Sequence, residues 1–301
     1  MLDIDRLRGI YCAVVTPVSK SADGESLDEV GFRKLITHLL EGGIHGLTVL
    51  GSAGEATTLP EEQKRRAIEI AVDEVKGRIP IVVGTGNSSL HRTIEETNIA
   101  ARLGADVAIV VPPFYYPLTQ EGVVAYYQSL VKNTELPIIL YNIPPFSKIS
   151  IAPETVKTLS KIDRIIGLKD TSRDFEYLQK LLFTADRTKF RIFLGTDGLL
   201  AAGLQMGADG VIGISPNFDP RLDVELWDAF HKGDFESAVT AQKKIDKLLD
   251  VIRMGVFPAG LKATTSMLGF VSRDPWSPST PLPESQMDIV RSKLKDLGYK
   301  I

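Results

Sequence analysis

Residues 47–85 read LTVLGSAGEATTLPEEQKRRAIEIAVDEVKGRIPIVVGT and hold a pattern that recurs along the chain. Leu47–Gly51 is a short apolar run, Glu61–Val75 carries apolar residues at helical spacing, and Ile81–Thr85 is a second short run, rich in β-branched residues. Runs of this length bounded by Gly or Pro are typical of buried strands, and the stretch between them is long enough for a helix. We therefore predict a strand–helix–strand unit with parallel strands.

The same alternation continues over most of the chain, and a strand begins about every 28 residues, the length of one strand–helix step. An open doubly wound sheet alternates in the same way, but eight evenly spaced units over residues 10–232 favour a closed barrel. We therefore predict the α/β class and a (β/α)8 TIM barrel. The predicted strands are Tyr11–Thr16, Leu47–Gly51, Ile81–Thr85, Val107–Val111, Ile138–Asn142, Ile165–Lys169, Ile192–Gly195 and Val211–Ser215, and the helices between them include Leu27–Glu41, Glu61–Val75, Thr93–Leu103, Gln120–Asn133 and Glu154–Leu159.

Helix signals also organise the C-terminal part of the chain. Glu236–Val251, Ala259–Leu268 and Glu284–Leu297 have helical patterns, and the Pro- and Ser-rich segment Pro275–Pro283 separates the last two. We predict a catalytic barrel domain over residues 1–232 and a C-terminal helical extension over residues 233–301. Two S/T-x-x-E patterns, at residues 26–29 and 58–61, predict capping boxes at the starts of two barrel helices.

Composition narrows the classes of function. The 301 residues are 44% hydrophobic and 24% charged, which is ordinary for a globular protein, and the net charge of −3 comes without the basic stripe that binds nucleic acid. The longest apolar run, near Ala108–Phe114, is far shorter than the roughly 18 residues of a membrane span. Residues 1–8 lack the apolar segment of a secretory signal, so we expect a cytoplasmic protein. A single cysteine, Cys12, and four scattered histidines predict neither a disulfide nor a metal site.

Lys169 is the first candidate for chemistry, because active sites of such barrels lie at the carboxyl ends of the strands. Alternation along Ile165–Lys169 puts Gly167 and Lys169 on one face and Asp170 on the other, which leaves room beneath a long side chain. A lysine in a dry cavity loses its proton more readily, and the neutral amine attacks a ketone to form a Schiff base. The residues alone leave open the alternative of a strand-end lysine that reaches solvent or pairs with Asp170.

Tyr141 and Ser52 are the next candidates. Tyr141 closes an apolar strand and has a hydroxyl that could pass protons to and from a substrate, although an aromatic plug at the barrel rim fits the same position. Ser52 lies between Gly51 and Gly54, which would let backbone amides approach a ligand carboxylate. A plain glycine-rich turn between strand and helix is the alternative there.

Four motifs together resemble one family. They are Gly51-x-x-Gly54-Glu55, Tyr141-Asn142-x-Pro144, Gly167-x-Lys169-Asp170 and Gly207-Ala208-Asp209-Gly210-Val211-Ile212. In this order and spacing they are similar to those of the dihydrodipicolinate synthase and N-acetylneuraminate lyase family, over nearly the whole chain. The resemblance implies a (β/α)8 barrel with C-terminal helices, a homotetramer built as a dimer of dimers, and pyruvate Schiff-base chemistry without metal or organic cofactor.

The resemblance also implies roles for individual residues. Lys169 would form the imine, and Tyr141 would be the general acid and base. Ser52 would link Tyr141 to Tyr115, a second tyrosine that comes from the neighbouring subunit in this family. The remaining implied substrate contacts are the amides of Ser52 and Ala53 for the pyruvate carboxylate, Ile212 in the pyruvate pocket, and the backbone of Gly195.

Two departures from the family pattern bear on the substrate. Phe146 stands where the synthase branch has an arginine for the carboxylate of the aldehyde, and a phenyl ring cannot replace that clamp. Asp197-Gly198 and Ile214 stand where the neuraminate branch has an Asp-Glu pair and a serine. Both specialised substrates are therefore disfavoured. Asp197 is expected either to bind distal hydroxyls of the aldehyde portion or to cap a helix at residues 198–206.

The resemblance with these departures implies a Schiff-base-forming, pyruvate-dependent lyase or aldolase. It would cleave or form a 2-oxo-3-deoxy sugar acid or a related 4-hydroxy-2-oxoacid, with pyruvate and an aldehyde or 2-oxoacid as its partners. The alternatives are a dehydratase of a 2-oxo-3-deoxy acid, and 4-hydroxy-tetrahydrodipicolinate synthase with a carboxylate clamp from elsewhere in the chain. A pyruvate-binding barrel without turnover is the alternative from another class.

Overall fold

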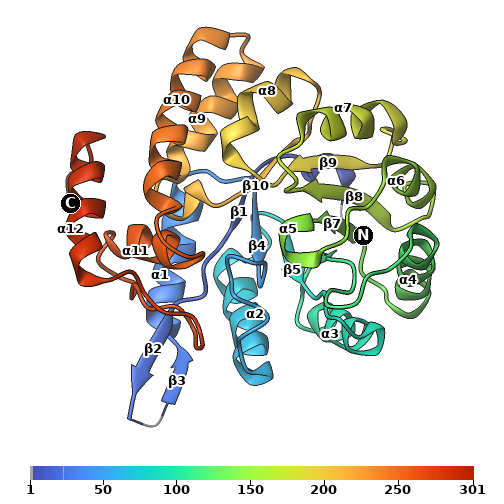
Figure 1. Cartoon of the computed structure of the whole chain (residues 1–301), viewed down its shortest axis with the longest axis horizontal. Helices are drawn as coiled ribbons and strands as arrows, with labels where there is room; N and C mark the ends of the chain where they lie inside the picture. The colour runs from blue at the N-terminus through green and yellow to red at the C-terminus, as the bar shows by residue number, and fades with distance from the viewer. Residues whose placement is uncertain (1–2, 23) are drawn as a thin grey trace.

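The computed structural model describes residues 3–22 and 24–301 and contains a closed barrel of parallel strands (Figure 1). The eight predicted strands are confirmed, with their ends displaced by three residues or fewer. Residues 1 and 2, part of the segment inspected for a secretory signal, lie outside the described residues. In the order in which they are hydrogen-bonded around the barrel, the strands are β1 (Gly9–Ala13), β10 (Gly210–Gly213), β9 (Arg191–Leu194), β8 (Ile165–Asp170), β7 (Ile138–Asn142), β6 (Val107–Val110), β5 (Ile81–Gly84) and β4 (Gly46–Val49).

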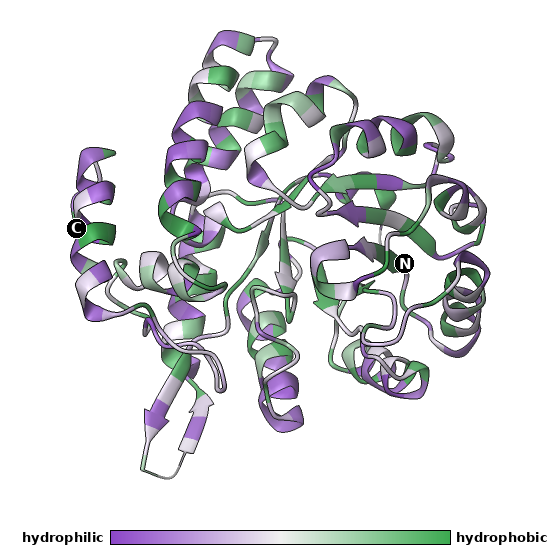
Figure 2. Ribbon diagram, viewed as in Figure 1, coloured by the Kyte–Doolittle hydropathy of each residue, from purple (hydrophilic) through white to green (hydrophobic). Residues whose placement is uncertain are grey.

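Helices follow the strands and surround them (Figure 1). They are α1 (Glu29–Glu41), α2 (Glu61–Val75), α3 (Leu90–Arg102), α4 (Gln120–Asn133), α5 (Pro144–Ser147), α6 (Pro153–Leu159), α7 (Phe175–Thr184), α8 (Leu200–Gln205) and α9 (Pro220–His231), with short 3-10 turns η1 (Ile4–Arg6), η2 (Asp197–Leu199) and η3 (Ser215–Asn217). The barrel strands are mostly green in Figure 2, whereas the helices carry purple, hydrophilic residues among green ones. This pattern follows from burial of the parallel strands on both faces.

The segment before α1 differs from the prediction. A helix was expected over Leu27–Glu41, but Leu27 pairs with Val18 in an antiparallel hairpin formed by β2 (Val18–Ser21) and β3 (Gly24–Leu27). The N-cap is Asp28, whose carboxylate accepts the amide of Gly31 at 2.9 Å. The predicted capping box at residues 26–29 is therefore wrong.

The capping box at residues 58–61 is also wrong, although α2 begins at Glu61 as predicted. Thr58 donates its hydroxyl to the carbonyl of Glu55 at 2.9 Å, and Pro60 precedes the helix without a side-chain cap. The threonine is thus used by the turn after β4 instead of by the helix.

Three helices continue the chain beyond the barrel: α10 (Phe235–Ile252), α11 (Ala259–Ser266) and α12 (Glu284–Asp296). Helix α10 packs along α9 (Figure 1), and α11 and α12 pack against α10. The turn between α9 and α10 contains the predicted boundary at residue 233, and the division into two domains stays a prediction. Within residues 3–22 and 24–301 no helix is long and apolar enough to cross a membrane.

Candidate active site

Lys169 and Tyr141 face each other at the carboxyl ends of two neighbouring strands. They are register partners on β8 and β7, so their side chains leave the sheet on the same side. The lysine is 5% exposed, and its Nζ lies 4.5 Å from the centre of the tyrosine ring. These two candidate residues therefore lie side by side in the fold.

Asp170 does not neutralise this lysine. Its carboxylate points to the other face of β8, where it accepts from Asn142 Nδ2 at 2.7 Å and from the Ser172 hydroxyl at 2.8 Å. No carboxylate lies within ion-pair distance of Lys169 in the described part of the chain. The alternative in which Lys169 pairs with Asp170 is thus wrong. Gly167 is needed for a different reason from the predicted one, since a Cβ there would lie 2.7 Å from the backbone oxygen of Arg191.

A second buried lysine, Lys262, differs from Lys169 in that protein oxygens surround its ammonium. Lys262 on α11 is 1% exposed, and its Nζ forms an ion pair with Glu55 at 2.6 Å. The same ammonium donates to the backbone oxygens of Thr16 at 2.9 Å and Asp274 at 3.0 Å. Three protein oxygens therefore surround this ammonium. Lys169 has no such partners among the described residues, which leaves its amine available to a ligand.

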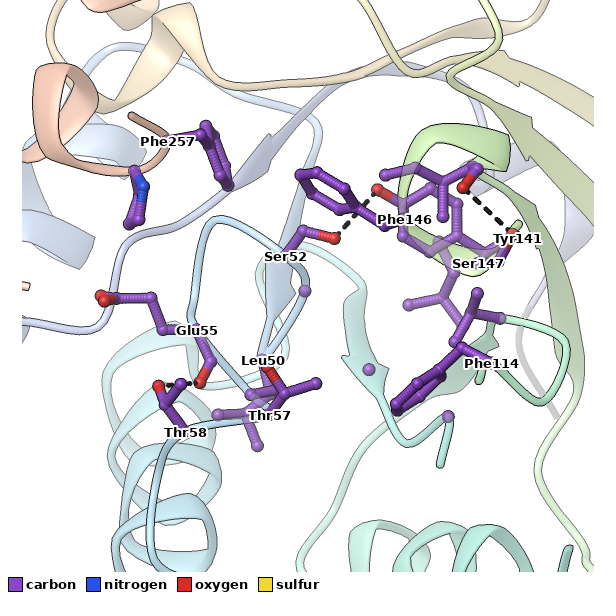
Figure 3. A pocket seen from close by; sticks show the side chains of 18 of the residues that line it. Leu50, Ser52, Glu55, Thr57, Thr58, Phe114, Tyr141, Phe146, Ser147 and Phe257 are labelled. Carbon is purple, nitrogen blue, oxygen red and sulfur yellow. Dashed lines mark hydrogen bonds between the residues drawn. The ribbon is translucent and has the colours of Figure 1, made fainter. Parts of the chain in front are cut away.

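Ser52 reaches the same place from the turn after β4. Its Oγ lies 3.3 Å from the Tyr141 hydroxyl, the contact drawn as a dashed line in Figure 3. The turn is tight, because a Cβ on Gly54 would lie 3.0 Å from the amide of Leu50. Neither the Ser52 amide nor the Ala53 amide has an acceptor in the described residues, so both can donate to an anion.

These side chains border a cavity of about 450 Å³, which we call the lysine cavity. The candidates that line it are Ser52, Ala53, Tyr141, Phe146, Lys169, Gly195 and Asp197. Ile212 does not line it: this residue is buried within β10, and Ile214 forms the wall at the end of that strand. A role for Ile212 in the pyruvate pocket stays a prediction.

Asp197 is held by the protein. Its carboxylate accepts the Ile214 amide at 3.0 Å and the Ser215 hydroxyl at 2.7 Å, and a Cβ on Gly213 would collide with it. It does not cap the following helical segment, whose N-cap is Thr196 without a side-chain bond. Asp197 therefore ties the loop after β9 to the end of β10, and contact with substrate hydroxyls stays a prediction.

A second cavity of about 390 Å³, the side cavity, adjoins the first. Ser52, Tyr141, Phe146 and Phe257 line both cavities, and Figure 3 shows them around the side cavity. The Phe146 and Phe257 rings lie 6.0 Å apart between their centres. An aromatic pair thus occupies the rim where the family resemblance placed an arginine.

Tyr115 is not brought to the site within one chain. It is 82% exposed, with its ring against Tyr116, and it lines neither cavity. Its implied role as a residue supplied by a neighbouring subunit stays a prediction.

Several residues of the lysine cavity were not predicted from the sequence, among them the polar residues Thr171, Arg173 and Arg253. The buried Thr171 hydroxyl has no hydrogen-bond partner in the described residues. Thr171 lies two residues after the strand-end Lys169, and this spacing was a signal that its side chain lies at the barrel mouth. Arg253 follows α10 and had no comparable signal, because only the fold brings it to the barrel mouth.

A closed barrel with C-terminal helices, and a buried lysine beside a tyrosine at the strand ends, define the class of (β/α)8-barrel lyases. Residues 6–297 match the model of the dihydrodipicolinate synthetase family. The 4-hydroxy-tetrahydrodipicolinate synthase of Kosmotoga olearia is 35% identical over 293 residues, which cover 97% of this chain and 98% of that one.

Solved structures agree with this. The chloride-inhibited dihydrodipicolinate synthase of Acinetobacter baumannii, complexed with pyruvate, has a TM-score of 0.91 and 32% identity, covering 97% of this chain and 99% of that one. YagE, an E. coli prophage protein of the dihydrodipicolinic acid synthase family in complex with pyruvate, has a TM-score of 0.91 and 31% identity, covering 97% and 98%. The chain belongs to the dihydrodipicolinate synthetase family and is an enzyme, a lyase of that family.

Proposed function

We propose that this lyase joins pyruvate to an aldehyde, or cleaves the product, through an imine on Lys169. The observation that carries the proposal is the buried Lys169 amine, which has no hydrogen-bond or ionic partner among the described residues and lies 4.5 Å from the centre of the Tyr141 ring at the wall of the lysine cavity. Pyruvate is the ligand of the YagE and A. baumannii complexes, which supports the same ketone here. A 4-hydroxy-2-oxoacid, including the 2-oxo-3-deoxy sugar acids, is the proposed substrate class.

In the cleavage direction the Lys169 nitrogen attacks the C2 ketone, and water leaves as the imine forms. Tyr141 then accepts the proton of the C4 hydroxyl while the C3–C4 bond breaks, and the bonding electrons move into the imine to give an enamine. The aldehyde departs. Protonation at C3 and addition of water at C2 release pyruvate and restore the amine.

Other groups of the lysine cavity would assist these reaction steps. The free amides of Ser52 and Ala53 would bind the carboxylate next to the ketone, which orients C2 toward Lys169. The Ser52 hydroxyl lies 3.3 Å from the Tyr141 hydroxyl. It would accept the proton that Tyr141 releases and pass it onward. A dehydratase would use the same imine to expel the hydroxyl as water, so product analysis distinguishes the two reactions.

One observation favours a second candidate, the 4-hydroxy-tetrahydrodipicolinate synthase reaction. Relatives at 34% and 35% identity over nearly their whole length carry that name. Against it stands Phe146, in the position of the aldehyde-binding arginine of that branch.

The proposal is tested by borohydride reduction with and without pyruvate, followed by peptide mass spectrometry. We expect a pyruvate-dependent adduct on Lys169 and none on Lys262, the other buried lysine. Lys169→Arg, which keeps the charge, should abolish both the adduct and turnover. An unmodified Lys169 under saturating pyruvate would refute the proposal.

A further inference from the structure

The lysine cavity carries more positive charge than the imine chemistry requires. Its wall contains Lys169, Arg173 and Arg253, and Asp197 is its one carboxylate among the described residues. The Asp197 oxygens already accept hydrogen bonds from the Ile214 amide and the Ser215 hydroxyl. The cavity therefore favours an anionic ligand with more than one negative group.

Neither arginine is neutralised by the protein. In the described part of the chain neither has a carboxylate within ion-pair distance, and Asp174, beside Arg173, caps α7 by accepting the Tyr177 amide at 3.0 Å. Arg253 donates to the Thr196 hydroxyl at 3.2 Å, which holds its side chain against the loop after β9. Arg253 is exposed at the cavity wall. Its partial burial, and next the charge of Arg173, lower the pKa of its guanidinium, although Asp197, Asp246 and Asp250 act in the opposite direction.

The barrel topology separates these arginines from the amides of Ser52 and Ala53. Ser52 follows β4, whereas Arg173 follows β8, and these strands lie four positions apart in a ring of eight. The two loops are thus on opposite sides of the barrel mouth. A substrate held by its first carboxylate at Ser52 would extend across Lys169 toward the arginines.

We propose that the lysine cavity selects substrates with an acidic group at each end. The carboxylate next to the ketone binds the Ser52 and Ala53 amides, and a distal carboxylate or phosphate binds Arg173 and Arg253. This inference rests on the proposed function. It makes the aldehyde partner acidic, and it places the anion clamp on the β8 loop and the end of α10 instead of at Phe146.

The first experiment uses imine trapping, which needs no aldehyde turnover. Borohydride reduction is carried out over a range of 2-oxoadipate or 2-oxohexanoate, six-carbon 2-oxoacids that differ by a distal carboxylate. We expect 2-oxoadipate to half-saturate Lys169 labelling at a concentration about 10- to 100-fold lower, the range of one or two charge-assisted hydrogen bonds. In Arg173→Gln/Arg253→Gln this difference should disappear, while Arg253→Lys should retain part of it.

Arg102→Gln is the matched control, since Arg102 is an exposed arginine at the end of α3 that lines neither cavity. It should behave as the unmodified enzyme does. Retained pyruvate labelling shows that each variant is folded. If pyruvate labels Lys169 but the two six-carbon acids saturate alike, the clamp is refuted and the imine chemistry stands. If pyruvate itself fails to label Lys169, the proposed function falls, and the clamp falls with it.

Aldehyde pairs then identify the distal group. Succinic semialdehyde is compared with butanal, and glyceraldehyde 3-phosphate with glyceraldehyde, each at saturating pyruvate. A preference of about 10-fold or more in kcat/KM within the first pair indicates a carboxylate, and within the second a phosphate. Either preference, if it is lost in the double arginine variant, supports the clamp. Equal use of the acidic and neutral members of both pairs would overturn it.

Discussion

Glu55 and Lys262 form a buried ion pair, 2.6 Å between Oε2 and Nζ, that joins the turn after β4 to helix α11. Glu55 also accepts the amide of Trp276 at 2.9 Å, so one carboxylate holds two segments of the C-terminal extension. Burial raises the pKa of Glu55 and lowers that of Lys262, and the attraction between the two charges opposes both shifts. Because Glu55 lies three residues after Ser52, this contact also positions the candidate site.

We therefore expect Lys262→Met to destabilise the protein by about 3–5 kcal/mol, since it leaves the Glu55 charge buried and unpaired. Lys262→Met/Glu55→Gln should recover most of that loss, because glutamine is neutral and can still accept from Trp276. Urea unfolding of the two variants measures the difference. Equal stability of single and double variants would show that the ion pair does not hold the extension in place.

Because of the buried carboxyl group of Asp223, we expect the free energy of unfolding to depend on pH. It is fully buried with its carboxylate 2.9 Å from the Ser215 hydroxyl, and burial, together with the charge of Asp197, raises its pKa well above the usual value. The Ser215 hydroxyl lies within hydrogen-bond distance of both Asp197 and Asp223 but has one hydrogen. We therefore expect Asp223 to be protonated and to donate to Ser215, which then donates to Asp197.

A group whose pKa is raised by folding contributes stability that is complete below its unfolded pKa and is lost as pH rises through its folded pKa. Asp223→Asn, which keeps a donor without a titrating proton, should therefore remove this part of the pH dependence and become the more stable form at alkaline pH. The test compares the thermal unfolding temperature of Asp223→Asn with that of the unmodified protein at several values between about pH 5 and about pH 9. Parallel curves would contradict a protonated Asp223.

The strands, and the positions of Lys169 and Tyr141 at strand ends, could be predicted from sequence because both depend on local patterns. Apolar runs between Gly and Pro mark buried parallel strands, and the carboxyl ends of these strands lie together at the barrel mouth. The hairpin β2–β3 escaped prediction because its residues are mostly exposed and polar, without apolar alternation.

Residues that act through distant partners could not be found in this way. Arg173 and Arg253 are separated by 80 positions and meet only when α10 returns to the barrel mouth. The role of Asp197 depends on Gly213 and Ser215 of the next strand and loop, and no spacing within the loop after β9 indicates it. Likewise, the sequence pattern cannot show that Lys262 is paired with Glu55 whereas Lys169 has no ionic partner among the described residues.

Tyr141→Phe should separate the two halves of the proposed reaction. The ring beside Lys169 remains, so imine trapping should persist, whereas turnover with aldehyde should fall about 10²- to 10⁴-fold for loss of the general acid and base. Ser52→Ala keeps the backbone amides and should cost less. Tyr127→Phe is the matched control, because this buried hydroxyl donates to the Val110 carbonyl outside both cavities. It should lower stability without changing turnover, and a Tyr141→Phe enzyme as active as this control would disprove the assignment.

The position of Tyr115 leads to a prediction about assembly. Its side chain is exposed, so Tyr115 can complete the Ser52–Tyr141 relay only if it comes from another subunit. Tyr115→Phe should leave thermal stability of the single chain unchanged and reduce turnover. Lys169→Ala should be inactive, but its Tyr115 remains intact. When the two variants are co-expressed with different tags and purified as hybrids, a site with Lys169 from one chain and Tyr115 from the other should regain activity. Hybrids no more active than Tyr115→Phe homomers would mean that Tyr115 does not act across an interface.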